Sequence, residues 1–191
     1  MLTVLVIDES RSRAGEICAG LALAGYQVAA ILAGADNLTA EVERLQPDVI
    51  LIDTDSPSRD TLENLAAMNK DMPRPVVVFT QEEAPDTMRD ALKAGVSAYV
   101  VAGLDPKRIK TIVDVARVRF EDTQALRREL DEISKKLSDR KLVDKAKGVL
   151  MKARGLDEDA AYHAMRKLAM ERGQTMAKVA RDVIDMARVL L

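Results

Sequence analysis

Three acids and a threonine stand at the ends of apolar runs, where they could carry chemistry. Asp8 and Glu9 directly follow the first run, Asp53 ends a later one, and Thr80 ends the next. In a parallel sheet the carboxyl ends of neighbouring strands meet at one edge, so these side chains are expected to converge. Carboxylates are ligands that Mg²⁺ prefers. The residues therefore predict a Mg²⁺ site at Asp8, Glu9 and Asp53, in which Asp53 could accept a phosphoryl group and Thr80 could hydrogen-bond its oxygens.

No second set of catalytic residues stands out. The single cysteine, Cys18, and the single histidine, His163, are far apart in the sequence, which argues against a disulfide, a multi-cysteine metal site and a catalytic dyad. We therefore expect a protein that is not an enzyme and requires no cofactor beyond optional Mg²⁺. No apolar run approaches the roughly 20 residues that span a bilayer, and the N-terminus lacks a signal-peptide pattern. These features predict a cytoplasmic protein with no membrane partner.

Alternating elements over residues 1–120 would position the acids. Five apolar runs are typical of strands, and the segments between them have the apolar spacing of helices. The expected strands are 2–7, 26–32, 49–52, 76–79 and 98–101, and the expected helices are 11–24, 37–45, 59–69 and 85–94. Apolar strands that alternate with helices indicate a parallel sheet covered on both faces. Residues 1–120 are thus predicted to form a five-stranded, flavodoxin-like α/β domain, with the first strand beside the third.

From Pro106 onward the strand pattern disappears, and a long linking helix is expected over 106–138. No Gly or Pro occurs between Pro106 and Gly148. Four apolar residues in this helix are spaced 4, 3 and 4 apart, as in a heptad seam: Leu126, Leu130, Ile133 and Leu137. The spacing favours a coiled coil in a homodimer, or packing on a neighbouring element. An ordinary amphipathic helix is the alternative.

Residues 139–191 predict a small all-α domain of three helices. The first is expected over about 139–153, and Asp157 and Thr175 are expected to cap the second and third. This domain carries 12 Lys and Arg against 8 Asp and Glu, whereas residues 1–120 carry 13 against 18. Only the C-terminal domain therefore favours a polyanion.

Eight cations of this domain are candidates for RNA binding, because they lie on short helices around an alanine-rich core. They are Lys145, Lys147, Lys152, Arg154, Arg166, Lys167, Arg172 and Lys178. Phosphate contacts would supply most of the affinity, and Tyr162 could offer an aromatic face to an unpaired base. The alternatives are a solvated helix face for each cation and a core position for Tyr162. Substitution of Lys147 or Arg166 is expected to leave thermal stability nearly unchanged, because both are expected to point outward.

Residues 1–120 resemble the receiver domain of two-component, phosphorelay response regulators. The resemblance is carried by Val-Ile-Asp8-Glu9-Ser, Leu-Ile-Asp53-Thr-Asp-Ser-Pro and Val-Phe-Thr80. It implies that Asp53 is the phosphoacceptor and that Asp8 and Glu9 are metal carboxylates. It also implies that Thr80 is the switch hydroxyl and Tyr99 the switch aromatic.

One departure from the receiver pattern bears on phosphorylation. Receivers normally end the fifth strand with Lys-Pro, and Ala102-Gly103 stands there instead. Loss of that buried cation is expected to weaken phosphorylation or its transmission. A receiver fold retained as a protein-binding platform is therefore favoured over regulated phosphorylation of Asp53.

Residues 126–190 closely resemble the ANTAR domain, the RNA-binding output domain of AmiR- and NasT-type antitermination regulators. Two motifs carry the resemblance, Ala-Lys147-Gly-Val-Leu-Met and Ala-Tyr162-His-Ala-Met-Arg166-Lys-Leu-Ala-Met. Together with the receiver-like half, they make the chain similar to the AmiR/NasT family, and within it to the NasT-type, nitrate-responsive regulators.

The resemblance implies a signal-dependent regulator that binds hairpins in leader mRNA, as a homodimer, and prevents terminator formation. The NasT-type likeness further implies nitrate or nitrite assimilation genes and a NasS-type, nitrate/nitrite-sensing protein that holds the regulator until ligand arrives. Two alternatives stay open: a DNA-binding response regulator whose last helices enter a major groove, and a purely protein-binding regulatory scaffold.

Overall fold

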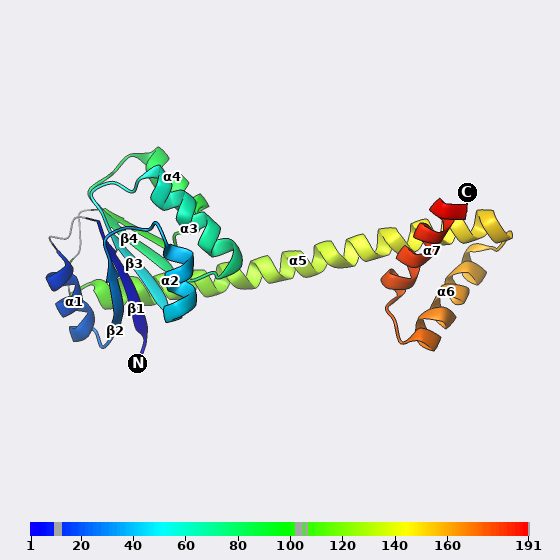
Figure 1. Ribbon diagram of the computed structural model, residues 1–191, viewed down its shortest axis with the longest axis horizontal. Coiled ribbons are helices and arrows are strands. Elements are labelled where there is room, and N and C mark those ends of the chain that lie inside the picture. The colour runs from blue at the N-terminus through cyan, green and yellow to red at the C-terminus, as the bar shows by residue number, and fades with distance from the viewer. Residues whose placement is uncertain (10–12, 102–104, 106, 191) are drawn as a thin grey trace. The chain divides into compact units, whose positions relative to one another are not determined.

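The computed structural model describes residues 1–9, 13–101, 105 and 107–190, and the chain divides into two compact units, Met1–Gln124 and Ala125–Leu191 (Figure 1). The strands of the first unit are β1 (Thr3–Asp8), β2 (Gln27–Leu32), β3 (Val49–Asp53), β4 (Val76–Thr80) and β5 (Ala98–Val101). Its helices are α1 (Ala14–Leu23), α2 (Leu38–Leu45), α3 (Arg59–Asp71), α4 (Pro85–Lys93) and the first part of α5 (Ile109–Arg154).

The five strands form one parallel sheet in the order β2-β1-β3-β4-β5, which confirms the predicted doubly wound topology. β1 lies between β2 and β3, and its register places Asp8 directly beside Asp53. Crossover helices cover both faces, so the central strands are apolar throughout: every residue of β3 and of β4 is buried.

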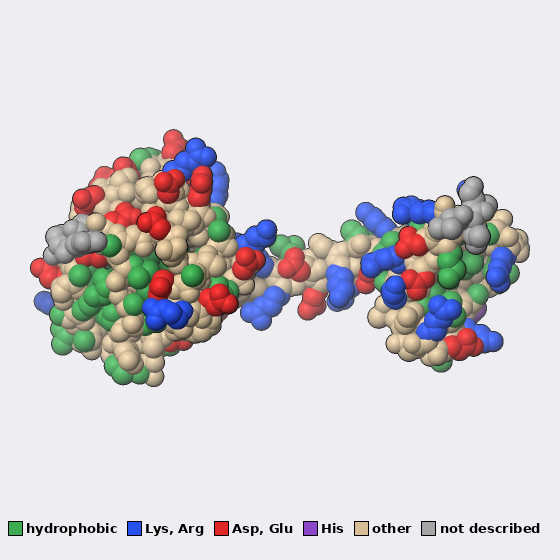
Figure 2. Space-filling model, viewed as in Figure 1, with side chains coloured by type: hydrophobic (Ala, Val, Ile, Leu, Met, Phe, Trp, Pro, Cys, Tyr) green, Lys and Arg blue, Asp and Glu red, His purple; other side chains and the backbone are tan. Residues whose placement is uncertain are grey.

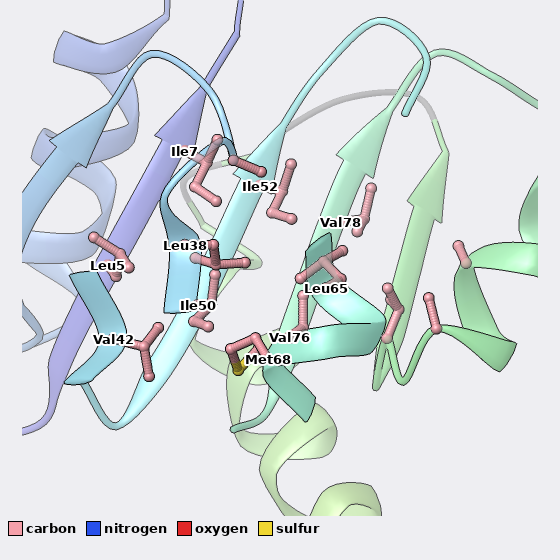
Figure 3. Close-up of a cluster of buried hydrophobic side chains, with 14 residues drawn as sticks. Leu5, Ile7, Leu38, Val42, Ile50, Ile52, Leu65, Met68, Val76 and Val78 are labelled. Atoms are coloured by element: carbon pink, nitrogen blue, oxygen red, sulfur yellow. The ribbon is translucent and has the colours of Figure 1, made fainter. Parts of the chain in front are cut away.

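Two apolar layers hold this unit together, one on each face of the sheet. On one face α2, α3 and α4 pack on alternate strand residues, and Figure 3 shows Leu38, Leu65 and Met68 against Ile50 and Val76. On the other face α1 and the first turns of α5 pack on the intervening strand residues. The members of α1 and α5 in this second layer are Ile17, Leu21, Ile109, Val113 and Ala116.

A single continuous helix, α5, runs from the first unit into the second. It spans 46 residues, Ile109–Arg154, so the helices expected over 106–138 and 139–153 are one element. The sequence accounts for this continuity, because neither Gly nor Pro interrupts α5 before Gly148. The second unit is completed by α6 (Glu158–Arg172) and α7 (Met176–Leu190).

Local capping explains where α6 and α7 begin and end. The Asp157 carboxylate accepts a hydrogen bond from the Ala160 amide at 2.7 Å, and the Thr175 hydroxyl accepts one from the Lys178 amide at 3.2 Å. Gly173 ends α6 in the left-handed conformation, with φ +60°. Both predicted N-caps are therefore confirmed. The core of this unit is small: Ala146, Met165, Ala169, Val179, Ala180 and Ile184.

Candidate functional site

The predicted acids converge at the carboxyl edge of the sheet. Asp8 and Asp53 are adjacent residues on paired strands and are 1% and 0% exposed, and Thr80 at the end of β4 is 1% exposed. Two carboxylates at this depth repel each other and are poorly solvated. Burial accordingly raises the pKa of Asp53, and the proximity of Asp8 adds to that rise.

A guanidinium that the sequence interpretation did not single out lies against Asp53. Arg13, the residue before α1, places Nε 2.8 Å from Oδ2 of Asp53 and an NH₂ group 3.3 Å from Oδ1 of Asp55. Its positive charge opposes the rise in the pKa of Asp53. The available signal in the sequence was its position, four residues after Glu9. Ala102 and Gly103, the departure from the Lys-Pro pattern, lie outside the described residues.

Glu9 turns towards hydroxyl groups rather than towards the two aspartates. Its carboxylate accepts hydrogen bonds from Thr54 Oγ1 at 2.6 Å and from Thr61 Oγ1 at 2.8 Å. Within the described ranges, no three His, Cys, Asp or Glu side chains converge closely enough to hold a metal ion. As arranged, the pocket does not fit the expected three-carboxylate ligand set. Mg²⁺ binding at Asp8, Glu9 and Asp53 stays a prediction that requires Glu9 and Arg13 to turn.

The predicted switch residues are linked through the loop after β4. Thr80 Oγ1 donates to the backbone oxygen of Asp55 at 2.8 Å and accepts from the Glu82 amide at 3.1 Å. The Tyr99 hydroxyl donates to the backbone oxygen of Glu82 at 3.1 Å, and partial burial raises the pKa of Tyr99. Both side chains thus bind the segments beside the pocket. Their role in switching stays a prediction.

Seven of the eight candidate RNA-binding cations fall into two groups in the second unit. Five are exposed and form no ion pair within the described part of the chain: Lys145, Lys152, Arg154, Arg166 and Arg172. Lys167 and Lys178 are exposed but reach Glu171 at 3.9 Å and Asp182 at 2.7 Å, one turn along their own helices. Figure 2 shows Lys and Arg side chains spread over the face of this unit that is turned to the viewer.

Lys147 is the exception, and the expectation that it points outward is wrong. Its side chain is 15% exposed, with Nζ 2.8 Å from Oδ1 of Asp144 and 2.6 Å from Oε1 of Glu158. The hydrogen bond with Asp144, and then the one with Glu158, raise the pKa of Lys147. Because Asp144 lies on α5 and Glu158 opens α6, Lys147 ties the two helices together.

Tyr162 and the predicted seam present apolar surface. Tyr162 is 40% exposed, and its ring stands at 71° to that of His163 with 6.0 Å between centroids. Along α5, the four seam residues are more than half exposed: Leu126 61%, Leu130 63%, Ile133 54% and Leu137 54%. They have no partner within this chain that would cover them, as far as the described residues extend. No helix in the described residues is both long and apolar enough to cross a membrane.

Comparison with known proteins matches both units. Residues 4–114 match the response regulator receiver domain, and residues 131–184 match the ANTAR domain. "Transcriptional regulatory protein PdtaR" of Mycobacterium tuberculosis is 29% identical over 161 residues, which cover 84% of this chain and 78% of that protein. "Nitrate regulatory protein" of Klebsiella oxytoca is 36% identical over 75 residues, 39% of this chain and 19% of that protein.

Solved structures agree with the fold of the first unit. A CheY-like response regulator receiver domain from Methanospirillum hungatei superposes with a TM-score of 0.56 at 21% identity, covering 64% of this chain and 98% of that one. At this identity the likeness establishes the fold alone.

Proposed function

This chain belongs to the response regulators, with a receiver domain followed by an ANTAR domain, and we propose that it binds structured leader RNA and promotes transcription antitermination. The proposal follows from the ANTAR match and from the residues that this unit exposes. It places the action of the protein in the cytoplasm of a bacterium, where leader transcripts form.

One observation carries the proposal: five cations of the ANTAR unit are exposed without acidic partners among the described residues. They are Lys145, Lys152, Arg154, Arg166 and Arg172. The charge of a cation in an ion pair is balanced by its carboxylate, which a phosphate would have to displace, whereas these five form no ion pair among the described residues. Each phosphate that they neutralise would release condensed counterions, which favours RNA binding at low salt. Tyr162, partly exposed, could stack on an unpaired loop base.

The same proposal includes a homodimer formed along α5. Leu126, Leu130, Ile133 and Leu137 have heptad spacing and stand more than half exposed, which an isolated helix in water does not favour. A parallel coiled coil would bury them and would present two ANTAR units to paired hairpins.

The signal proposed for this regulator is nitrate or nitrite, relayed by a sensing protein that holds the regulator until ligand arrives. The support is the similarity to the nitrate regulatory protein, which is limited to 39% of the chain. The receiver would serve as the docking platform for that partner. The Arg13–Asp53 ion pair supports this choice, because Arg13 already neutralises the carboxylate that phosphorylation would use.

Binding assays can test the proposal directly. The purified chain is titrated with the transcript of the region upstream of its own operon and with duplex DNA of the same sequence. We expect preferential binding of the transcript, weakened severalfold by Arg166→Ala and little changed by Arg89→Ala, an exposed arginine on α4 that is paired with Asp86. Preference for the duplex would support a DNA-binding regulator, and absence of binding to both would support a protein-binding scaffold.

A further inference from the structure

A glycine lies in the interior of α5 where no contact among the described residues requires one. Gly148 is six residues before the end of the helix at Arg154. Among the described residues, a Cβ built on Gly148 would meet no heavy atom within 4 Å other than its chain neighbours and the local helix backbone. Gly148 is also absent from the residues with positive φ, so its backbone suits any L-residue. Because Gly destabilises a helix relative to Ala, the chain carries a weakness here that its own packing does not explain.

The neighbours of Gly148 on the helix surface are two lysines, Lys145 and Lys152, together with Asp144 and Met151. Positions three and four apart lie on one face of an α-helix, so Lys145 and Lys152 flank Gly148, and Lys141 lies two turns before it. All three lysines are exposed, and none has a carboxylate within ion-pair distance in the ranges that the structure describes. The nearest acid along the helix, Asp144, is engaged with Lys147 at 2.8 Å. The three lysines therefore form a positively charged strip along α5, and the missing side chain of Gly148 leaves a gap within it.

We propose that this strip, Lys141, Lys145, Gly148 and Lys152, is where the sugar-phosphate strand of RNA crosses α5, with a phosphate seated over Gly148. Because Gly148 has no Cβ, a phosphate can come closer to the helix backbone there than at any other residue of α5, by about the thickness of a methyl group. The ammonium groups of Lys145 and Lys152 can then contact it from both sides. This inference rests on the proposed RNA-binding function and assigns to that function a specific contact surface.

The charge of the strip favours RNA over a second copy of the chain as the occupant. Two such strips facing each other would bring like charges together. The apolar seam does not continue to Gly148 either, because the 4–3 register beyond Leu137 meets Arg140, Asp144 and Lys147. A polyanion fits both the charge and the gap.

The test substitutes Gly148→Ala in the full-length protein and measures two properties with expected changes of opposite sign. The melting temperature should rise, because Ala stabilises the helix and its methyl group meets open space. Affinity for an end-labelled tandem-hairpin RNA should fall by about fivefold or more, because the added methyl holds the phosphate away. Gly148→Leu should weaken binding further. Lys145→Gln and Lys152→Gln should each lower the slope of log affinity against log salt by about one.

Gly15→Ala is the matched control. Gly15 lies in α1 of the receiver unit, and its Cβ would likewise meet nothing within 4 Å in the part of the chain that the structure describes. This substitution should leave RNA affinity unchanged. If Gly148→Ala binds RNA as the unsubstituted chain does, the strip is not the contact surface, although the proposed function stands. If sedimentation shows that Gly148→Ala alters dimer dissociation and not RNA affinity, a second copy occupies the gap and the inference is overturned. If the unsubstituted chain ignores hairpin RNA, the proposed function itself fails.

Discussion

Removal of Arg13 tests whether an internal cation neutralises the receiver carboxylate. Arg13→Met keeps much of the side-chain volume but removes the charge that lies 2.8 Å from Asp53. Asp53 is 0% exposed, so water cannot replace the lost partner. The substitution should therefore destabilise the receiver unit at neutral pH, and should do so only while Asp53 is ionised.

The magnitude follows from the geometry of the pair. A 2.8 Å contact between Nε and Oδ2 places the charge centres about 4 Å apart, where two unit charges interact by about 4 kcal/mol at an effective dielectric constant of about 20. The Arg13 side chain is 27% exposed, so solvent screens part of this attraction. We expect Arg13→Met to lower the unfolding free energy of the receiver unit by about 2–3 kcal/mol at pH 7.

The pH dependence has a definite sign. The pKa of Asp53 is raised in the folded state, so above its unfolded pKa the native state binds more protons, and stability falls as pH rises through the folded pKa. Without Arg13 the pKa of Asp53 in the folded state moves higher. Each unit of that rise lowers the unfolding free energy by about 1.4 kcal/mol where Asp53 is ionised. The difference in unfolding free energy between Arg13→Met and the unsubstituted chain should therefore be largest where Asp53 is ionised in both proteins, and should close as the pH is lowered and Asp53 becomes protonated.

A double-mutant cycle with Asp53→Asn provides the measurement. Hydrogen exchange at the slowest amides of β1 and β3 reports unfolding of this unit separately from the ANTAR unit, which matters because a two-unit chain need not unfold in one step. Arg13→Met should have little effect in the Asp53→Asn background, giving a coupling energy of about 2 kcal/mol or more. A coupling energy below about 0.5 kcal/mol would refute the idea that Arg13 is the counter-charge of Asp53.

Three further predictions concern other parts of the chain. Lys147→Ala should lower the melting temperature of the ANTAR unit, because it breaks contacts with Asp144 and Glu158 that join α5 to α6. Thermal melts followed by circular dichroism check this, with Lys145→Ala, an exposed lysine of the same helix, as the control. Ile133→Asp should convert a dimer to a monomer in sedimentation experiments, since it places a charge in the exposed seam, and an unchanged dimer would exclude the seam as the interface. Asp53→Asn should retain most antitermination on a leader–reporter fusion, whereas complete loss would mean that phosphorylation at this carboxylate is required.

Most of the receiver fold could be predicted because its signals are local. Apolar runs bounded by turns mark the strands, and their alternation with helices requires a parallel sheet, so the meeting of Asp8 and Asp53 followed from topology alone. The continuity of α5 was also available from the lack of Gly and Pro before Gly148. What helical spacing could not provide was the partner of each side chain.

The two largest departures are contacts made across tertiary structure. Lys147 lies on the polar side of its helix by spacing, but Glu158 reaches it from the next helix, so a side chain expected in solvent became a link between helices. Arg13, which directly precedes α1, meets Asp53 although it lies 40 positions earlier in the chain. Glu9 was expected to be a metal ligand beside Asp8 and Asp53, but its carboxylate accepts hydrogen bonds from Thr54 and Thr61 instead. None of these pairings has a periodicity that could have indicated it.

The unbroken course of α5 between Leu137 and Ala146 constrains the length of this segment. Each residue of an α-helix advances the azimuth by about 100°, so one inserted residue would turn the lysine strip through that angle relative to the seam. Seven inserted residues make nearly two full turns and almost restore the original phase. Insertions and deletions here should therefore preserve RNA binding by a dimer only at lengths that nearly restore this phase, such as about 7 or 11 residues, because α5 sets the angle between its oligomerising stripe and its cationic stripe.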